Sequence, residues 1–281
     1  MEAWRSIVRG DPAADHEVIR EILVRIAEAW SLAVALQLVL WLVQRRTNNA
    51  GIVDVGWAAS FALVIGLFAW RATAPLDAWW PIALIVVLWS VRLTGYLVAR
   101  GAARSPEEGR YVELRRKWSP HEARRFFVFF QAQAALTGVL STAFVVPFVE
   151  APWDGGWLRA LGAAIAVAGI AGEALADAQL ARWKRDPANR AKVCDTDLWA
   201  YSRHPNYFFE WLYWVGLAVY GLAFAPWGLI AIAPQAIILG SILGVTGIPP
   251  TEAQSLRSKG DAYREYQRRV SRFIPLPPKR A

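Results

Sequence analysis

The chain has 281 residues, of which 56% are hydrophobic, and it carries a formal net charge of +8. Its one cysteine, Cys194, excludes an internal disulfide and any metal site built from several cysteines. The apolar residues fall into runs of about 20 residues, the length of helix that crosses a bilayer. The positive charge lies between these runs, which indicates the basic loops of a membrane protein rather than a nucleic-acid surface.

The succession of apolar runs predicts an all-α fold, a polytopic membrane helical bundle with about seven transmembrane helices. A polar N-terminal segment, 1–26, holds a short amphipathic surface helix at 14–27. The membrane domain, 27–246, follows, and a polar tail, 247–281, belongs to the same domain. The predicted spans, in chain order, are 27–43, 50–70, 79–99, 126–149, 157–181, 207–225 and 227–246.

Basic charge alternates between successive loops. Arginine and lysine are frequent in the segments 100–125 and 182–206 and in the tail, whereas the loops 150–156 and 224–226 contain neither. Because positively charged loops stay on the cytoplasmic side, we expect these three basic segments, and with them the C-terminus, to be cytoplasmic.

Five ionisable residues lie inside or at the edge of predicted spans, where a charge is costly unless it meets a partner or a cavity. Two simple interpretations need no ligand: Asp54 pairs with Arg92, and the acids at 173 and 177 neutralise a basic residue near the cytoplasmic edge. Glu173 and Asp177 are four residues apart and therefore share one helix face. The five residues are Asp54, Arg92, Glu173, Asp177 and Glu210.

The segment 198–210 concentrates polar groups at the start of the sixth span, with Arg203, His204, Asn206 and Glu210 close together. Unpaired polar groups at that depth cost several kcal/mol each. A bound polar ligand would offset the cost. Two simpler interpretations are that His204 caps a helix and that Glu210 faces a helix N-terminus.

The tail is predicted to form an amphipathic helix over 261–269. Tyr263, Tyr266 and Val270 share one face, and three arginines share another. This helix would either hold a phosphate-rich ligand with its Tyr and Arg side chains or lie on anionic lipid headgroups.

The chain has no dinucleotide-binding glycine motif after a strand, no phosphate-binding P-loop and no H-E-x-x-H sequence. We therefore predict no metal site, and any nucleotide must be held by the bundle itself.

With these residues in view, the chain resembles the steroid 5α-reductase superfamily, and most closely its bacterial branch of unknown function, DUF1295. The matching elements run in order over about four-fifths of the chain. They are Asp54-x-x-Trp57; Arg110-Tyr111 with Arg115; Gln131-x-Gln133; Asp177-x-Gln-Leu-x-x-Trp-Lys184-x-Asp-Pro-x-Asn189; Leu198-Trp-x-x-Ser-Arg-His-Pro-Asn-Tyr-Phe-x-Glu210; Gly247-Ile-Pro-x-x-Glu252; and Tyr263-x-x-Tyr-Gln-x-Arg269 with Ile274-Pro275.

The resemblance implies a seven-helix bundle of the bacterial inner membrane that binds NADPH from the cytoplasmic side. A hydride would go to the β-carbon of a lipophilic α,β-unsaturated ketone while an acid polarises the carbonyl. The resemblance implies Asp54 and Tyr96 as catalytic residues and Trp57, Trp89 and Gln133 at the substrate. The implied cofactor-binding residues are Asp177, Lys184, Arg203, His204, Asn206, Tyr207, Glu210, Glu252, Tyr263, Tyr266 and Arg269.

A protonated Asp54 would suit this chemistry, since burial among apolar residues favours the neutral carboxyl. The steroid enzymes carry a Gln-Glu pair on the second span, whereas here Val53 precedes Asp54. Their third-span tyrosine also aligns nearer Trp89 than Tyr96.

Two alternatives stay open at this point. The segment from Arg203 to Tyr207, together with Glu252 and the tail, is also similar to the isoprenylcysteine carboxyl methyltransferases, which use S-adenosylmethionine. The other alternative is a non-catalytic protein that binds membrane lipids. We expect no nucleic-acid or protein partner in any of these cases.

Overall fold

The computed structural model describes residues 12–104, 106–154, 156–190 and 192–279. Within these ranges the chain forms helices joined by short loops, and seven helices are long and apolar enough to cross a membrane. The prediction of an all-α integral membrane protein is thereby confirmed. The seven segments are Ala13–Thr47, Ile52–Trp70, Leu76–Ala99, Glu122–Ala143, Trp157–Arg185, Pro205–Phe224 and Trp227–Lys259.

Three boundaries differ from the prediction. Helix α2 (Pro12–Thr47) runs through the expected break at residue 26, because its sequence after Pro12 contains no Gly or Pro to end it; the first 11 residues of the predicted polar segment lie outside the described ranges. Helix α6 (Glu122–Leu140) ends before two 3₁₀ turns, η1 (Ser141–Ala143) and η2 (Val146–Phe148). The last span begins with the 3₁₀ turn η6 (Trp227–Ala231) and continues through α9 (Ile232–Gly240), a π-helical turn (Ser241–Val245) and α10 (Ile248–Lys259).

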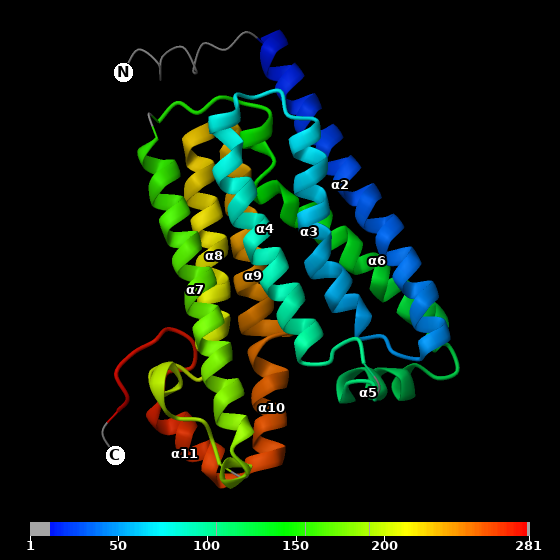
Figure 1. The fold of residues 1–281 in the computed structure, drawn as a ribbon, viewed down its shortest axis with the longest axis vertical. Helices are drawn as coiled ribbons and strands as arrows, with labels where there is room; N and C mark the ends of the chain where they lie inside the picture. Colours follow the sequence, from blue (N-terminus) through cyan, green and yellow to red (C-terminus); the bar gives the residue numbers. More distant parts are fainter. Residues whose placement is uncertain (1–11, 105, 155, 191, 280–281) are drawn as a thin grey trace. The chain divides into compact units, whose positions relative to one another are not determined.

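The chain divides into two compact units. The N-terminal unit comprises Met1–Gly156 and Gly221–Ala231, and it contains α2, α3 (Ile52–Trp70), α4 (Leu76–Ala99), α5 (Gly109–Trp118) and α6. Helix α2 packs against α3 and α6, α3 packs against α4, and the short α5 lies against α6 (Figure 1). Edge-to-face aromatic contacts of Phe61 with Trp89 and with Phe144 form part of its core.

The C-terminal unit comprises Trp157–Tyr220 and Ile232–Ala281, and contains α7 (Trp157–Arg185), most of α8 (Pro205–Gly221), α9, α10 and α11 (Asp261–Arg269). Helices α7 and α8 run side by side (Figure 1), and their backbones approach closely. A Cβ on Gly169 would lie 2.6 Å from the backbone nitrogen of Tyr213, and one on Gly216 would lie 2.4 Å from that of Ala166. Small residues at such positions allow the close approach typical of membrane helices.

The tail is part of the packed structure of the C-terminal unit. Tyr263, Tyr266 and Val270 are buried together against Val193 and Leu256. Ser202 pairs with Ser271 in a single parallel β-bridge. The aromatic face of α11 therefore packs inward, whereas Arg264 and Arg268 are exposed.

The contact between α7 and α8 gives a stability prediction. Gly169→Ala should lower the free energy of unfolding by about 1–3 kcal/mol, because the added methyl group meets backbone atoms that cannot rotate away. Gly240→Ala is the matched control, since a Cβ there meets nothing within 4 Å and alanine favours the helix. Thermal unfolding in detergent compares the two variants. Equal midpoints would show that the backbones are not in contact.

Candidate functional site

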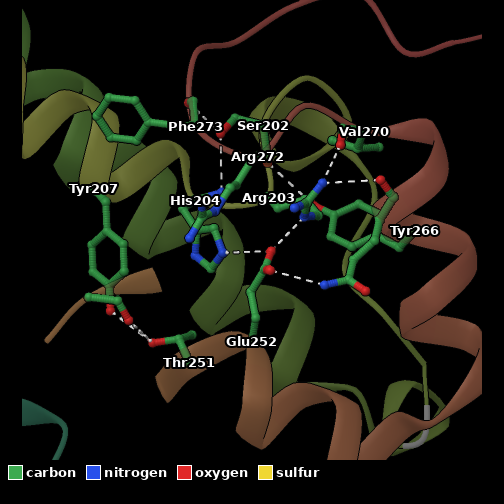
Figure 2. Close-up of polar contacts among 12 residues, drawn as sticks. Ser202, Arg203, His204, Tyr207, Thr251, Glu252, Tyr266, Val270, Arg272 and Phe273 are labelled. Atoms are coloured by element: carbon green, nitrogen blue, oxygen red, sulfur yellow. Dashed lines mark hydrogen bonds and ion pairs between the residues drawn. The ribbon is translucent and has the colours of Figure 1, made fainter. Parts of the chain in front are cut away.

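A carboxylate on α10 accepts hydrogen bonds from two other segments of the C-terminal unit, the residues just before α8 and helix α11 (Figure 2). Oε1 of Glu252 accepts hydrogen bonds from Arg203 Nε at 2.7 Å and from His204 Nε2 at 3.3 Å. The hydroxyl of Tyr263 donates to the same oxygen at 3.4 Å, and Gln267 Nε2 donates to Oε2 at 3.0 Å. We call these five residues the Glu252 cluster. Four donors on one carboxylate leave it well solvated by protein groups.

Arg203 is the cation of this cluster, and it hydrogen-bonds to the backbone of the tail. Its Nη1 group donates to the carbonyls of Gln267 and Val270 at 3.2 and 2.6 Å, and the side chain is 8% exposed. Its backbone nitrogen also bonds the Ser271 carbonyl at 2.8 Å. Only Nη2 makes no hydrogen bond to the residues that the structure describes. Arg203 thus has one group left for a ligand.

His204 occupies the boundary between the Glu252 cluster and α8. Burial lowers the pKa of His204, because the charged imidazolium loses contact with water. The Glu252 carboxylate raises this pKa and the nearby Arg203 lowers it, and the net shift is downward. A neutral imidazole that meets a carboxylate through Nε2 carries its proton there, which leaves Nδ1 as an acceptor. The ring stacks on Tyr207 with centroids 5.5 Å apart. His204 is therefore a neutral part of the cluster at pH 7 and not an anion-binding cation.

The two tail tyrosines are also neutral structural groups. Burial raises the pKa of Tyr263 to about 12, and burial also raises that of Tyr266. The Tyr266 hydroxyl donates to the carbonyl of Trp199 at 2.5 Å. Sequence interpretation placed both tyrosines at the cofactor. The structure places their side chains in the core that holds α11.

A second polar group joins α7 to the first turns of α8. Asn206 Nδ2 donates to Asp177 Oδ1 at 3.2 Å, and Asp177 is only 5% exposed. One turn along α8, Trp214 Nε1 donates to Glu210 Oε1 at 2.9 Å. The Tyr207 hydroxyl lies 3.2 Å from Thr251 Oγ1. The predicted residues Asp177 and Asn206 are thus in direct contact, and an acid and an amide beside each other offer both acceptors and donors to a ligand.

The basic residues of this unit differ in their availability. Arg182 pairs with Asp197 at 3.1 Å, and Arg269 pairs with Asp195 at 3.1 Å. Arg182 thus pairs with Asp197, and Arg203 with Glu252, rather than with Glu173 or Asp177 as the sequence suggested. Lys184 is exposed in the last turn of α7. Of the predicted cofactor-binding cations, Lys184 and Arg203 Nη2 are the groups that remain for an anion.

The catalytic prediction at Asp54 lies in the N-terminal unit, where the acid has a different partner from the expected Arg92. Nη2 of Arg110 donates to both Asp54 oxygens at 2.8 and 2.7 Å, and it also contacts the hydroxyl of the buried Tyr111. The Asp54 side chain is 17% exposed and that of Arg110 is 54% exposed. Both oxygens of Asp54 are therefore engaged by the Arg110 guanidinium in this arrangement.

The predicted substrate residues divide into core and interface. Trp89 is fully buried in edge-to-face contact with Phe61, so it serves packing. Trp57 Nε1 is buried and has no hydrogen-bond partner among the described residues. Ser60 Oγ on α3 lies 3.1 Å from Thr137 Oγ1 on α6, so these two residues are at the same height along the two helices. Trp57 and Gln133 each lie one turn before these hydroxyls, so both approach the same level of that interface.

Three further residues complete the description: Tyr96 was predicted to be catalytic, and the roles of Gln267 and Arg110 were not predicted. Tyr96 is half-buried on α4, with the Arg100 guanidinium 5.9 Å from its ring centroid. Gln267 belongs to the Glu252 cluster but was not singled out from the sequence, although it directly follows Tyr266 in the tail motif. Arg110 was noted only as part of a motif. Nothing in the local pattern of either residue identifies its partner, which lies 15 residues away for Gln267 and 56 for Arg110.

The Glu252 cluster should carry much of the stability of the tail. Glu252→Gln removes the counter-charge of the buried Arg203 and should cost about 3–5 kcal/mol, because a buried guanidinium would remain without its anion. Glu265→Gln, which breaks an exposed pair with Arg268, should cost less than about 1 kcal/mol. Denaturant unfolding in detergent measures both changes. Similar losses in the two variants would contradict a structural role for the cluster.

Comparison with known proteins gives one family match. Residues 40–270 match the model of a family described as "Protein of unknown function (DUF1295)". No curated protein and no solved structure gives a significant match. The match covers most of the chain, from Leu40 in the last turns of α2 to Val270 just after α11, and the chain therefore belongs to the DUF1295 family.

Proposed function

We propose that this protein is a membrane-embedded, NADPH-dependent reductase of a lipophilic α,β-unsaturated ketone, such as a steroid, an isoprenoid or a lipid-like enone. The proposal includes a relationship to the steroid 5α-reductase superfamily, a place in the bacterial inner membrane and a cytoplasmic C-terminus. The ordered motifs from Asp54 to Pro275 support the relationship, and the basic loops support the orientation.

The contact between Asp177 and Asn206 is the observation that carries the cofactor proposal. A buried carboxylate beside an amide suits the hydroxyls of a ribose or the carboxamide of a nicotinamide, which need acceptors and donors together. Lys184 and Arg203 Nη2 are the cations available to its phosphates. The residues present therefore fit a dinucleotide, with the nucleoside recognised by α7 and α8. Bound NADPH would supply the hydride.

In the N-terminal unit, the proposed polarising group is the indole of Trp57 rather than the carboxyl of Asp54. A buried N–H without a partner costs about 1–3 kcal/mol, and a substrate carbonyl that accepts from it would remove that cost. Asp54, paired with Arg110, would orient α5 against α3 beside the same helix turn. The surrounding aromatic core would exclude water from the carbonyl.

One observation favours a second candidate, a methyltransferase that uses S-adenosylmethionine. The acids Glu173, Asp177 and Glu210 lie on α7 and α8, and the first two are buried. Negative charge suits the sulfonium and amino groups of S-adenosylmethionine better than it suits phosphate. The two candidates therefore predict opposite ligand charges at the same helices.

A ligand panel separates these candidates. In detergent, NADPH should raise the unfolding temperature of the wild-type protein more than NADH or S-adenosylmethionine does. Asn206→Ala should weaken NADPH binding by roughly tenfold or more, since it leaves the buried Asp177 without its amide. Gln254→Ala, which removes an exposed amide from α10, is the matched control and should bind normally. Stabilisation by S-adenosylmethionine alone would replace the reductase with the methyltransferase.

Turnover tests the role of Trp57. Oxidation of NADPH is followed with a steroid 4-en-3-one and an isoprenoid enone as substrates. Trp57→Phe keeps the aromatic packing but removes the N–H donor, and it should lower kcat by about 10-fold to 100-fold while NADPH binding is unchanged. Trp89→Phe, a change of similar size in the aromatic core, should leave kcat within a few-fold of wild type. A Trp57→Phe enzyme with full kcat would remove Trp57 from the chemistry.

A further inference from the structure

A pocket outside both candidate sites lies between α5 and the first turns of α6, within the N-terminal unit. Its volume is about 540 Å³, and its lining is mostly apolar. Trp118, Val128, Phe129 and Ala132 provide the apolar wall. Trp118 packs against Phe126 and Phe129 with ring centroids 4.9 and 6.2 Å away, so aromatic contacts fix one side of the pocket.

The same pocket has a cationic end, formed by Arg124 and Arg125 with His121 beside them. Both arginines are exposed, and neither makes an ion pair or a side-chain hydrogen bond with the described part of the chain. Neighbouring arginines behave differently. Arg110 pairs with Asp54, and Arg115 pairs with Glu107 at 2.9 Å. The two pocket arginines thus hold positive charge that the protein leaves without a counter-charge.

The arrangement of these groups follows the profile of a bilayer. Arg124 and Arg125 are in the first turn of the fourth span, and Ala132 is two turns further along the same helix. At 1.5 Å per residue, Ala132 lies about 10 Å beyond Arg125 along the axis. This distance exceeds the headgroup layer, which is roughly 5–8 Å thick on each side of the hydrocarbon core. Cations therefore sit at headgroup depth and the apolar wall sits at acyl-chain depth.

We infer that this pocket binds one anionic phospholipid, with its phosphate on Arg124 and Arg125 and an acyl chain along Trp118, Val128 and Ala132. Charge complementarity selects this occupant, because two guanidinium groups without counter-ions match a phosphate that carries net negative charge. A zwitterionic headgroup carries its own cation beside the phosphate, so it gains less binding free energy from the two arginines. The site does not depend on the proposed reductase activity.

Native mass spectrometry of the protein in detergent, titrated with dioleoyl phosphatidylglycerol or dioleoyl phosphatidylcholine, measures binding directly. The wild-type protein should bind one phosphatidylglycerol more tightly than phosphatidylcholine. The double variant Arg124→Gln, Arg125→Gln should lose about 25-fold in affinity for phosphatidylglycerol, roughly fivefold per arginine. The control Arg116→Gln, Lys117→Gln removes equal charge from α5 outside the pocket lining. An equal loss in the control would show diffuse attraction and overturn the site.

A second pair of variants tests the acyl-chain wall without changing charge. Ala132→Phe fills the pocket and should abolish the tight binding of one phosphatidylglycerol, whereas Ala135→Phe, at an exposed position outside the lining, should preserve it. Unchanged binding in Ala132→Phe would overturn the proposal. Inorganic phosphate at millimolar concentration should not displace the lipid. Displacement by phosphate would show that the arginines bind a free anion and that the apolar wall has no part in it.

Discussion

The buried ion pair between Glu252 and Arg203 is the interaction on which the structure of the C-terminal unit depends. A carboxylate on α10 and a guanidinium just before α8 are 49 residues apart in sequence, and both are mostly removed from water. Such a pair is tolerated only when the remaining donors and acceptors are also satisfied. Here His204, Tyr263 and Gln267 supply the further donors to Glu252. One carboxylate therefore links α10 to α11 and to the residues just before α8.

This constraint changes the interpretation of the sequence motif around residue 204. A run of Arg, His and Asn at a membrane edge suggests a ligand site, yet the structure uses Arg203 and His204 mainly to hold the tail (Figure 2). Under the proposed function, the ligand-binding role falls to Asn206 and its partner Asp177. The motif would then contain two structural residues, Arg203 and His204, followed by a residue proposed to bind a ligand, Asn206.

The sequence predicts the spans well and the partners of charged residues poorly, for physical reasons. The length of an apolar run directly reflects bilayer thickness, so seven spans follow from composition alone. Internal boundaries are less certain, because π and 3₁₀ turns lengthen or end a span without a change in hydropathy. Asp54 illustrates the harder problem. Arg92 was the expected partner within the neighbouring span, but the fold of the loop brings Arg110 to it instead.

Two tryptophans of the N-terminal unit differ in whether the indole N–H has a hydrogen-bond acceptor. Trp57 and Trp89 both resemble substrate residues in sequence, and their rings contact each other at 6.1 Å. Trp89 is wholly covered by side chains. Trp57 has an indole N–H that is equally buried but has no acceptor in the described structure. A tryptophan in a core normally satisfies its N–H, as Trp199 does with the carbonyl of Ala176. The missing acceptor, rather than the aromatic ring, is therefore what supports the role proposed for Trp57.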